Sequence, residues 1–370
     1  MRPEPPAPQT DAQRLAWLRL SRSRNVGPRS FRSLVGRFGG AARALDALPD
    51  LASRGGARAY EACSERQGVA EMERAAKAGA RMLCLGDDAY PGRLAEIIDP
   101  PPFLWALGDP SLATGSVLGV IGARNASSVG LKMARMLGED LGARGHVIAS
   151  GLARGVDAIA HSAALKSGTI GVLAGGVDVT YPAENADLAA KMKEQGLLLS
   201  EAPMGLEPQG RHFPRRNRIV SGVSRAIIVI EAAARSVSLI TARYALDQGR
   251  EAMATPGSPL DPRAAGCNEL IRQGAALIRD ADDVEDVLGG PRSLSLHEPE
   301  ELFQHDVHLA PDPDLAARAA ALLTAAPVET DQLARDLAVP AATLSEALLE
   351  LDLAGRIERR PGGLIALAAE

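Results

Sequence analysis

The chain has 370 residues, of which 46% are hydrophobic and 24% are charged, and its formal net charge is −5 at pH 7. The length predicts two or three domains, and the composition is that of a soluble globular protein. No uncharged apolar stretch is long enough to span a bilayer, and the first ten residues have no signal-peptide core. The three cysteines are scattered and not in CxxC spacing, which argues against a disulfide framework or a zinc site. We therefore expect a cytoplasmic protein with reduced thiols, without a metal or cofactor and without a membrane partner.

Charge is distributed unevenly along the chain. Residues 1–60 hold eleven arginines against four acids, a local charge of +7, whereas residues 312–370 hold five arginines against ten acids, a local charge of −5. Residues 211–225 contain five arginines and no acid. The negative net charge therefore argues against a protein whose whole surface is positive, but it does not argue against one basic site.

Residues 12–60 have a helical pattern, with apolar residues such as Leu15 and Leu34 and a glycine-containing turn at residues 25–28. Helix pairs joined by such a turn are typical of small units that contact nucleic-acid backbones. A surface helix pair with solvated arginines fits the same pattern, and both interpretations stay open at this point.

Residues 116–290 alternate between short apolar runs and helical patterns. The expected strands are Val117–Ile121, Val147–Ala149, Ile170–Leu173, Leu197–Leu199, Ile227–Ile230 and Glu251–Ala254. The expected helices are Leu131–Leu141, Val156–Leu165, Asn185–Glu194, Leu239–Asp247 and Asn268–Gln273. Parallel strands covered by helices on both faces read as continuous aliphatic runs, so the pattern predicts a doubly wound α/β sheet.

The C-terminal sixth of the chain has the element order of a winged helix. A proline-rich linker precedes three helical patterns and a β-ribbon with a Pro-Gly-Gly turn. The third helix of most winged helices reads the major groove, but here Ala341–Gly355 contains Glu346, Glu350 and Asp352 and no Lys or Arg. Because these carboxylates would repel phosphates, we expect this helix to contact protein or to have a structural role. The predicted domains are a helical domain at 1–85, an α/β domain at 86–290, a linker at 291–314 and a winged-helix-like domain at 315–370.

Three loops that follow predicted strands combine glycine or hydroxyl residues with an arginine. The loops are Gly119–Gly130 with Arg124 and Ser127, Ser150–Asp157 with Gly151 and Arg154, and Glu231–Arg243 with Arg235, Ser238 and Thr241. Ligands of doubly wound sheets bind at these strand ends, where free N–H groups at helix starts favour anions. Helix-opening turns use the same residue types, so one such loop alone would be weak evidence. No GxxxxGK[ST], GxGxxG or GxSxG motif accompanies them.

The stretch RHFPRRNRIV at 211–220 predicts a binding site for a multiply charged anion. Four of its residues are arginines, and it lies directly before a predicted central strand. Guanidinium groups that lie close together need an anion to neutralise them. Four arginines in one stretch fit a row of phosphates better than a mononucleotide. Phe213 is the stretch's only aromatic residue, so we expect single-stranded DNA to be held by its backbone, with little base selectivity and steep salt dependence.

Several long motifs resemble the DprA family, also called Smf, the DNA-processing proteins of natural transformation. They are VIGARNxSxxG at 120–130, SGLARGVDAIAH at 150–161, GTIGVLAGGVDVTYP at 168–182, FPRRNRIVSG at 213–222, SLITARYALDQGR at 238–250 and ATPGS at 254–258. The resemblance implies a Rossmann-like DNA-binding domain between an N-terminal SAM-like helical domain and the winged-helix-like domain. It also implies a non-enzymatic recombination mediator that binds single-stranded DNA, forms a homodimer through the Rossmann-like domain and loads the RecA recombinase. The family usually has glycine where this chain has Val237, which puts phosphate contacts from that turn in doubt.

The predicted DNA site combines these observations, with Arg154 and Arg211 added from charge and position. Its members are Arg124, Ser127, Ser150, Gly151, Arg154, Arg211, Phe213, Arg215, Arg216, Asn217, Arg218, Ser238 and Thr241.

Two other functions remain as alternatives. One is a nucleotide hydrolase similar to the phosphoribohydrolases, using Asp157, His161 or Glu231 as an acid or base. The other is a winged-helix transcription regulator with a sensor domain, against which the acidic third helix argues.

Overall fold

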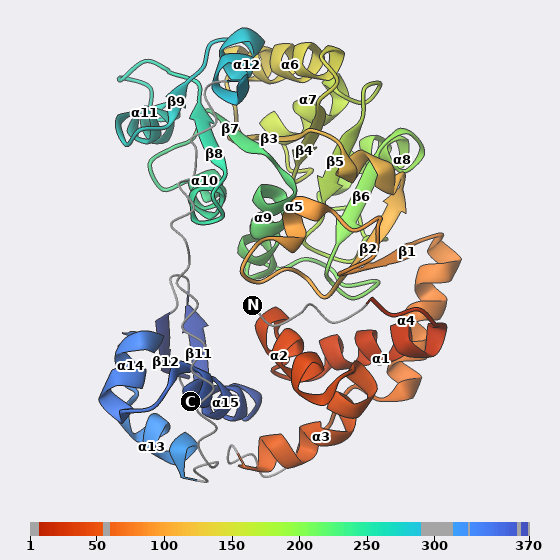
Figure 1. Cartoon of the computed structure of the whole chain (residues 1–370). Helices are drawn as coiled ribbons and strands as arrows, with labels where there is room; N and C mark the ends of the chain where they lie inside the picture. Colours follow the sequence, from red (N-terminus) through yellow and green to blue (C-terminus); the bar gives the residue numbers. More distant parts are fainter. Residues whose placement is uncertain (1–6, 55–59, 290–313, 325, 361–363, 369–370) are drawn as a thin grey trace. The chain divides into compact units, whose positions relative to one another are not determined.

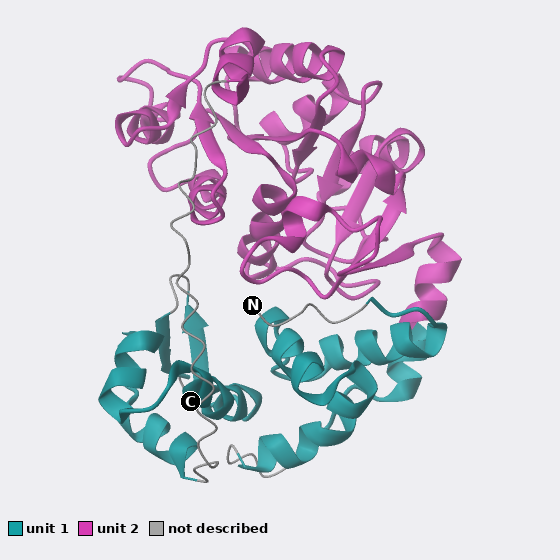
Figure 2. Ribbon diagram, viewed as in Figure 1, with its two compact units in different colours: residues 1–70, 295–370 teal, residues 71–294 magenta. Residues whose placement is uncertain are grey.

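The computed structural model describes residues 7–54, 60–289, 314–324, 326–360 and 364–368. The chain forms two compact units (Figure 2): residues 71–294 make the larger, and residues 1–70 with 295–370 make the smaller. The smaller unit is thus assembled from both ends of the chain. Among the described residues, no helix combines the length and the hydropathy needed to cross a membrane.

The larger unit is built on a sheet of nine described strands in the order β1-β2-β6-β5-β4-β3-β7-β8-β9 (Figure 1). They are β1 (Arg81–Cys84), β2 (Phe103–Gly108), β3 (Val117–Gly122), β4 (Val147–Ser150), β5 (Thr169–Val172), β6 (Leu197–Ser200), β7 (Ala226–Ile230), β8 (Glu251–Ala254) and β9 (Ala276–Leu277). The strands β6, β5, β4, β3, β7, β8 and β9 pair in parallel with their neighbours. Strands β1 and β2 add an antiparallel edge beside β6. The chain runs outward from β3 through β6 and then returns to β7 on the other side of β3. The strand order therefore reverses between β3 and β7, which confirms the predicted doubly wound fold.

Helices cover both faces of this sheet. They are α5 (Gly92–Ala95), α6 (Ser128–Ala143), α7 (Val156–Ala163), α8 (Ala186–Gln195), α9 (His212–Val223), α10 (Val237–Asp247), α11 (Ala265–Arg272) and α12 (Ala281–Gly289). Helices α6, α7 and α12 share one core with β3, β4 and β7, in which Leu137, Ile148 and Ile228 are fully buried. Helices α5, α9 and α10 lie across the sheet from α6 and α7 (Figure 1). Covered on both sides, β3 and β7 are buried along their whole length.

Helix α9 and the two antiparallel edge strands were not among the expected elements. Most of the arginine-rich stretch forms the first part of α9, because Pro214 lies in the first turn of the helix, where its missing N–H has no intrahelical partner to lose. The sequence shows no helical period here, since every residue from 216 to 223 is buried, Arg216 and Arg218 included.

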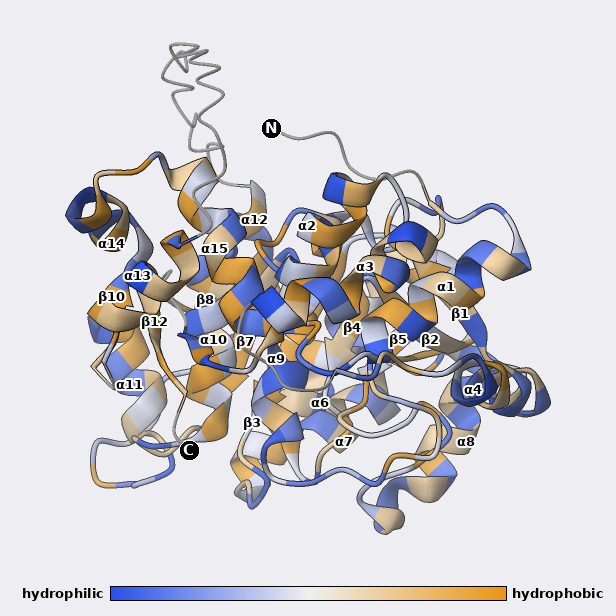
Figure 3. Cartoon of the chain, turned by 90° about the horizontal axis from the view of Figure 1, so that it is seen from below, coloured by the Kyte–Doolittle hydropathy of each residue, from blue (hydrophilic) through white to orange (hydrophobic). Residues whose placement is uncertain are grey.

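The smaller unit contains an N-terminal group of helices and a C-terminal winged helix. The N-terminal helices are α1 (Asp11–Arg22), α2 (Pro28–Phe38) and α3 (Ala41–Arg54), and α4 (Glu65–Ala78) runs from this unit into the larger one. The winged helix consists of α13 (Leu315–Leu322), β10 (Val328–Glu329), α14 (Thr330–Leu337), α15 (Ala341–Leu353), β11 (Ile357–Arg360) and β12 (Leu364–Leu367). Its strands form an antiparallel sheet in the order β10-β12-β11. Most of α4 carries hydrophilic residues (Figure 3), and it meets α1 where Gly68 leaves room for Leu15 and Arg19.

Candidate nucleic-acid interface

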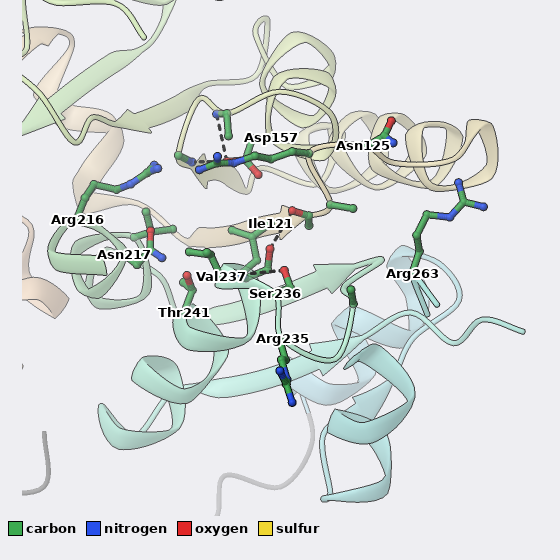
Figure 4. A pocket seen from close by; sticks show the side chains of 18 residues that line it. Ile121, Asn125, Asp157, Arg216, Asn217, Arg235, Ser236, Val237, Thr241 and Arg263 are labelled. Carbon is green, nitrogen blue, oxygen red and sulfur yellow. Dashed lines mark hydrogen bonds between the residues drawn. The ribbon is translucent and has the colours of Figure 1, made fainter. Parts of the chain in front are cut away.

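A cavity of about 530 Å³ lies where β3 and β7 end (Figure 4). It is lined by the loops after β3, β4 and β7 and by the neighbouring parts of α9 and α10. This is the reversal point of the strand order, the place where doubly wound sheets bind their ligands. The structure therefore brings together the arginine-rich stretch and the three glycine- or hydroxyl-containing loops that the sequence singled out.

The floor of the cavity contains a buried arginine and a buried carboxylate. Arg216 is 6% exposed, and its Nη1 donates to the carbonyl of Val172 over 2.8 Å. Asp157, 7% exposed, faces this guanidinium and accepts hydrogen bonds from the N–H groups of Gly151 (3.1 Å) and Ala153 (3.3 Å). Gly151 is required here, because a Cβ at this position would lie 1.7 Å from Arg216 Nη1.

Burial controls the charges at this floor. Desolvation lowers the pKa of Arg216 to about 10, against the opposing effect of Asp157. Desolvation also raises the pKa of Asp157, while Arg216 lowers it. Among the described residues, Arg216 Nε has no hydrogen-bond partner. A guanidinium that is buried, still charged at neutral pH and not fully hydrogen-bonded favours an incoming anion.

A cation of the cavity wall lies beside two aromatic rings that line a small adjoining hollow. The guanidinium of Arg124 lies 5.3 Å from the ring centre of Phe213, and the rings of Phe213 and Tyr181 are 5.9 Å apart. Tyr181 is 51% exposed and was missed from the sequence, because it lies thirty residues before the arginine-rich stretch. Its position in a Tyr-Pro pair after a glycine-rich loop could have drawn attention to it. Two adjacent rings offer bases a stacking surface, which the sequence interpretation had limited to Phe213.

Two further arginines lie at the mouth of the cavity. Arg235 and Arg263 are exposed and line it, and Figure 4 shows both guanidinium groups directed away from Asp157. Arg263 forms an ion pair with Asp261 over 2.9 Å. Neither belongs to the predicted site, although Arg235 is the arginine of the third loop that the sequence singles out.

Arg218 occupies a different environment from the one expected. It is 6% exposed and forms ion pairs with Glu201 and, over 3.6 Å, with Asp99. Its charge is thus neutralised by the protein's own carboxylates, and it anchors α9 to the neighbouring loops. It is not among the residues that line the cavity.

The remaining predicted cations lie outside the cavity lining. Arg154 forms an ion pair with Glu184, and Arg215 lies 3.8 Å from Glu201 but stays exposed. Arg211 is exposed, and its Nε donates to the ring of His212 over 3.3 Å. The expected arginine cluster therefore divides into two buried members and exposed members. Of the buried ones, Arg216 lines the cavity and Arg218 is paired within the fold; the exposed ones lie outside the cavity lining.

The N-terminus of α6 already holds an anion of the protein itself. Glu231 accepts hydrogen bonds from the N–H of Ser127, over 2.8 Å, and from its hydroxyl. Ser127 in turn accepts from the N–H of Gly130. The position at which a phosphate was expected is therefore occupied by a carboxylate, so Ser127 orients a loop beside the cavity and is not itself exposed to a ligand there.

The other predicted polar residues lie at or beneath the cavity wall. Asn217 and Thr241 line it and are almost fully buried, whereas Ser150 is fully buried. Ser238 also lines the cavity, but its hydroxyl donates to the carbonyl of Gly122 over 2.9 Å. Val237, in place of the family's usual glycine, is 44% exposed at the start of α10.

His161 is not part of an acid–base pair. Its Nδ1 is 2.6 Å from the hydroxyl of Thr169, and desolvation, aided by Arg216, lowers its pKa to about 3. With Glu231 engaged at α6, the residues of the hydrolase alternative are all committed to contacts within the fold.

Three family models match successive parts of the chain. A model described as DNA recombination-mediator protein A matches residues 81–289, more than half of the chain. A DprA-like N-terminal HHH domain matches residues 11–76, and a DprA winged helix domain matches residues 305–363.

Individual proteins agree with these matches. The chain is 41% identical to Protein Smf of Escherichia coli over 289 residues, which cover 75% of each protein. It is 44% identical to DNA processing protein DprA of Bacillus subtilis over 209 residues, 56% of this chain and 70% of that protein.

Two solved structures are also similar. The X-ray structure of DNA processing protein A from Streptococcus pneumoniae matches with a TM-score of 0.61 and 33% identity, covering 75% of this chain and 98% of that one. A structure of DNA processing protein A from Helicobacter pylori, whose study concerns its single-stranded DNA binding mode, matches with a TM-score of 0.52 and 29% identity, covering 56% of this chain and 95% of that one. The chain belongs to the DprA family, also called Smf, of DNA processing proteins.

Proposed function

We propose that the protein binds single-stranded DNA in the cavity at the end of β3 and β7 and acts there without catalytic turnover. The observation that carries the proposal is the combination of a buried, incompletely hydrogen-bonded guanidinium at Arg216 with the exposed cation of Arg124 at the rim. Phosphates are held by the cations, and bases stack on Tyr181 and Phe213.

In this proposal the residues at and around the site have different roles. Arg124, Arg216, Asn217 and Thr241 contact the strand, with Phe213 beside them. Gly151, Asp157 and Ser127 shape the loops, and Arg218 fixes α9. Arg211 and Arg215 extend the positive surface beyond the cavity.

The wider role follows from the family. A family described as recombination mediators supports a function in which the bound strand is passed to a recombinase. We extend this to loading of RecA during DNA uptake, by a cytoplasmic homodimer that associates through the larger unit. Stimulation of RecA filament formation on single strands coated by a single-strand binding protein tests this extension, and no stimulation would contradict it.

The DNA site itself is tested by neutralising the exposed cations of the cavity. Arg124→Gln with Arg235→Gln removes two such charges. Affinity for oligodeoxythymidylate should fall about tenfold or more, and the plot of log affinity against log salt should become shallower by about 1.4, or 0.7 for each lost phosphate contact. Fluorescence anisotropy at several salt concentrations measures both.

Arg135→Gln, an exposed arginine of α6 outside the cavity, is the matched control. It should leave the affinity and the salt slope unchanged. An unchanged slope in the double variant would reject the proposed site.

A further inference from the structure

Two buried polar side chains in the wall of the cavity have no hydrogen-bond partner. Asn217 of α9 is 6% exposed and Thr241 of α10 is 3% exposed, and both line the cavity. The structure contains no hydrogen bond from the Asn217 side-chain amide or the Thr241 hydroxyl to any described residue. Figure 4 shows both side chains on the wall that α9 and α10 form where they pack together. Because buried polar groups are nearly always paired in native proteins, these two are available to a ligand that enters the cavity.

The polar groups of this wall are neutral, and several of them are hydrogen-bond acceptors. The amide of Asn217 offers a donor beside an acceptor, and the Thr241 hydroxyl can donate or accept. The hydroxyl of Ser238 donates its hydrogen to the carbonyl of Gly122 over 2.9 Å, so its oxygen is left only as an acceptor. A phosphate oxygen only accepts and could not bond to these acceptors. The edge of a nucleobase carries donors beside acceptors, and side-chain amides and hydroxyls are neutral groups that read such edges.

The cavity also has the size and the apolar surface that a base needs. Its volume of about 530 Å³ lies within the range of roughly 300–1,000 Å³ that is usual for small-molecule sites. Val220 and Val237 line it, and Val237, in the first turn of α10, is 44% exposed. A base ring in the cavity would cover this apolar side chain. The exposed cations Arg124 and Arg235 remain for the phosphates that flank the base.

We propose that the cavity takes one base of the bound strand, turned out of its stack, and that Asn217 and Thr241 hold the edge of this base. The inference rests on the function proposed above and adds a contact of a different kind to it. Stacking on Tyr181 and Phe213 uses the face of a base, whereas the cavity uses its edge. Asn217 and Thr241 are therefore the residues through which the identity of a base affects affinity.

Two nearly isosteric substitutions remove the edge contacts without changing charge. Thr241→Val removes the hydroxyl, and Asn217→Leu replaces the amide by an apolar group of similar size. Each full-length variant is measured by fluorescence anisotropy against oligodeoxythymidylate and against an oligomer of equal length whose sugar–phosphate backbone carries no bases. Low ionic strength keeps binding to both strands measurable, because phosphate contacts strengthen as the salt concentration falls.

Each variant should bind oligodeoxythymidylate about threefold to tenfold more weakly, which is the usual value of one lost hydrogen bond between neutral groups. Both variants should bind the base-free strand as tightly as the original chain does. The salt slope should not change, because no charge is lost. A loss confined to the strand with bases supports the proposal, and either variant alone is sufficient to show it.

Thr255→Val is the matched control for the loss of a buried hydroxyl. Thr255 is 6% exposed but is not among the residues that line the cavity, and its hydroxyl donates to the carbonyl of Val229 over 3.5 Å. This substitution should leave binding to both strands unchanged. A loss in the control equal to that in Thr241→Val would assign the effect to a general change of the fold and overturn the proposal.

Equal losses on the two strands would also overturn the proposal, because Asn217 and Thr241 would then contact the backbone. Unchanged binding of oligodeoxythymidylate by both variants would overturn it as well. Neither result bears on the cations, which are tested separately by the salt slope of Arg124→Gln with Arg235→Gln. An unchanged slope there rejects the proposed function itself, so the two failures are distinguishable.

Discussion

Gly151 shows how one missing side chain determines the floor of the cavity. Any Cβ at this position overlaps the guanidinium of Arg216, which is buried and donates to the carbonyl of Val172. The glycine is therefore needed for close approach between a loop and a buried cation.

Gly151→Ala should lower the free energy of unfolding by about 1–3 kcal/mol and weaken DNA binding, because Arg216 must move. Gly210→Ala is the matched control, since nothing lies within 4 Å of a Cβ there. Urea unfolding and anisotropy of a labelled single strand measure the two effects. Equal behaviour of the two variants would mean that the loop adapts and that Gly151 has no special role.

His161 connects the same region to pH. Burial lowers its pKa in the folded chain from 6.5 to about 3, so between these values the unfolded chain binds the additional proton. Stability should therefore decrease as the pH falls through 6.5, by about 1.4 kcal/mol between pH 7.5 and 5.5. Urea unfolding at both pH values should show this decrease in the original chain and a smaller one in His161→Gln. The same decrease in both chains would assign the acid sensitivity to other groups.

At the scale of elements, the contact between Glu231 and Ser127 explains why two loops keep a fixed shape. Glu231 follows β7 and has a φ of 49°, and its carboxylate accepts hydrogen bonds from Ser127, the N-cap residue of α6. A helix N-terminus stabilises such a charge, and the charge ties together the loops on either side of the cavity.

Glu231→Gln should lower the free energy of unfolding by about 0.5–2 kcal/mol, the usual value of a helix cap, and leave affinity for single strands nearly unchanged. Glu194→Gln on the exposed side of α8 serves as the control. Assays with nucleoside monophosphates should show no turnover by any of the three chains. Turnover by the original chain that is lost in Glu231→Gln would instead support the hydrolase alternative.

At the scale of the whole molecule, the sequence predicted the sheet better than the site. The six expected strands are present because aliphatic runs such as Ala226–Ile230 need burial on both faces, and that requirement is visible locally. The burial of Arg218 was not visible, because Glu201 and Asp99 approach it only in the folded chain. The same holds for Tyr181 beside Phe213 and for Glu231 at Ser127, a contact between residues 104 positions apart. Charge in a sequence identifies a basic region, but pairing in three dimensions decides which cations stay available.

The smaller unit joins residues that are synthesised far apart in time. Asn25 and Leu353 are separated by 328 positions, so at roughly 5–20 residues per second the ribosome needs about 15–65 s to make the second after the first. During this interval α2 and α3 have emerged without the helix that later covers them. Part of that surface contacts α15 in the folded chain, and charged neighbours that stay exposed, such as Arg37 and Arg54, keep a nascent chain from aggregating in the meantime.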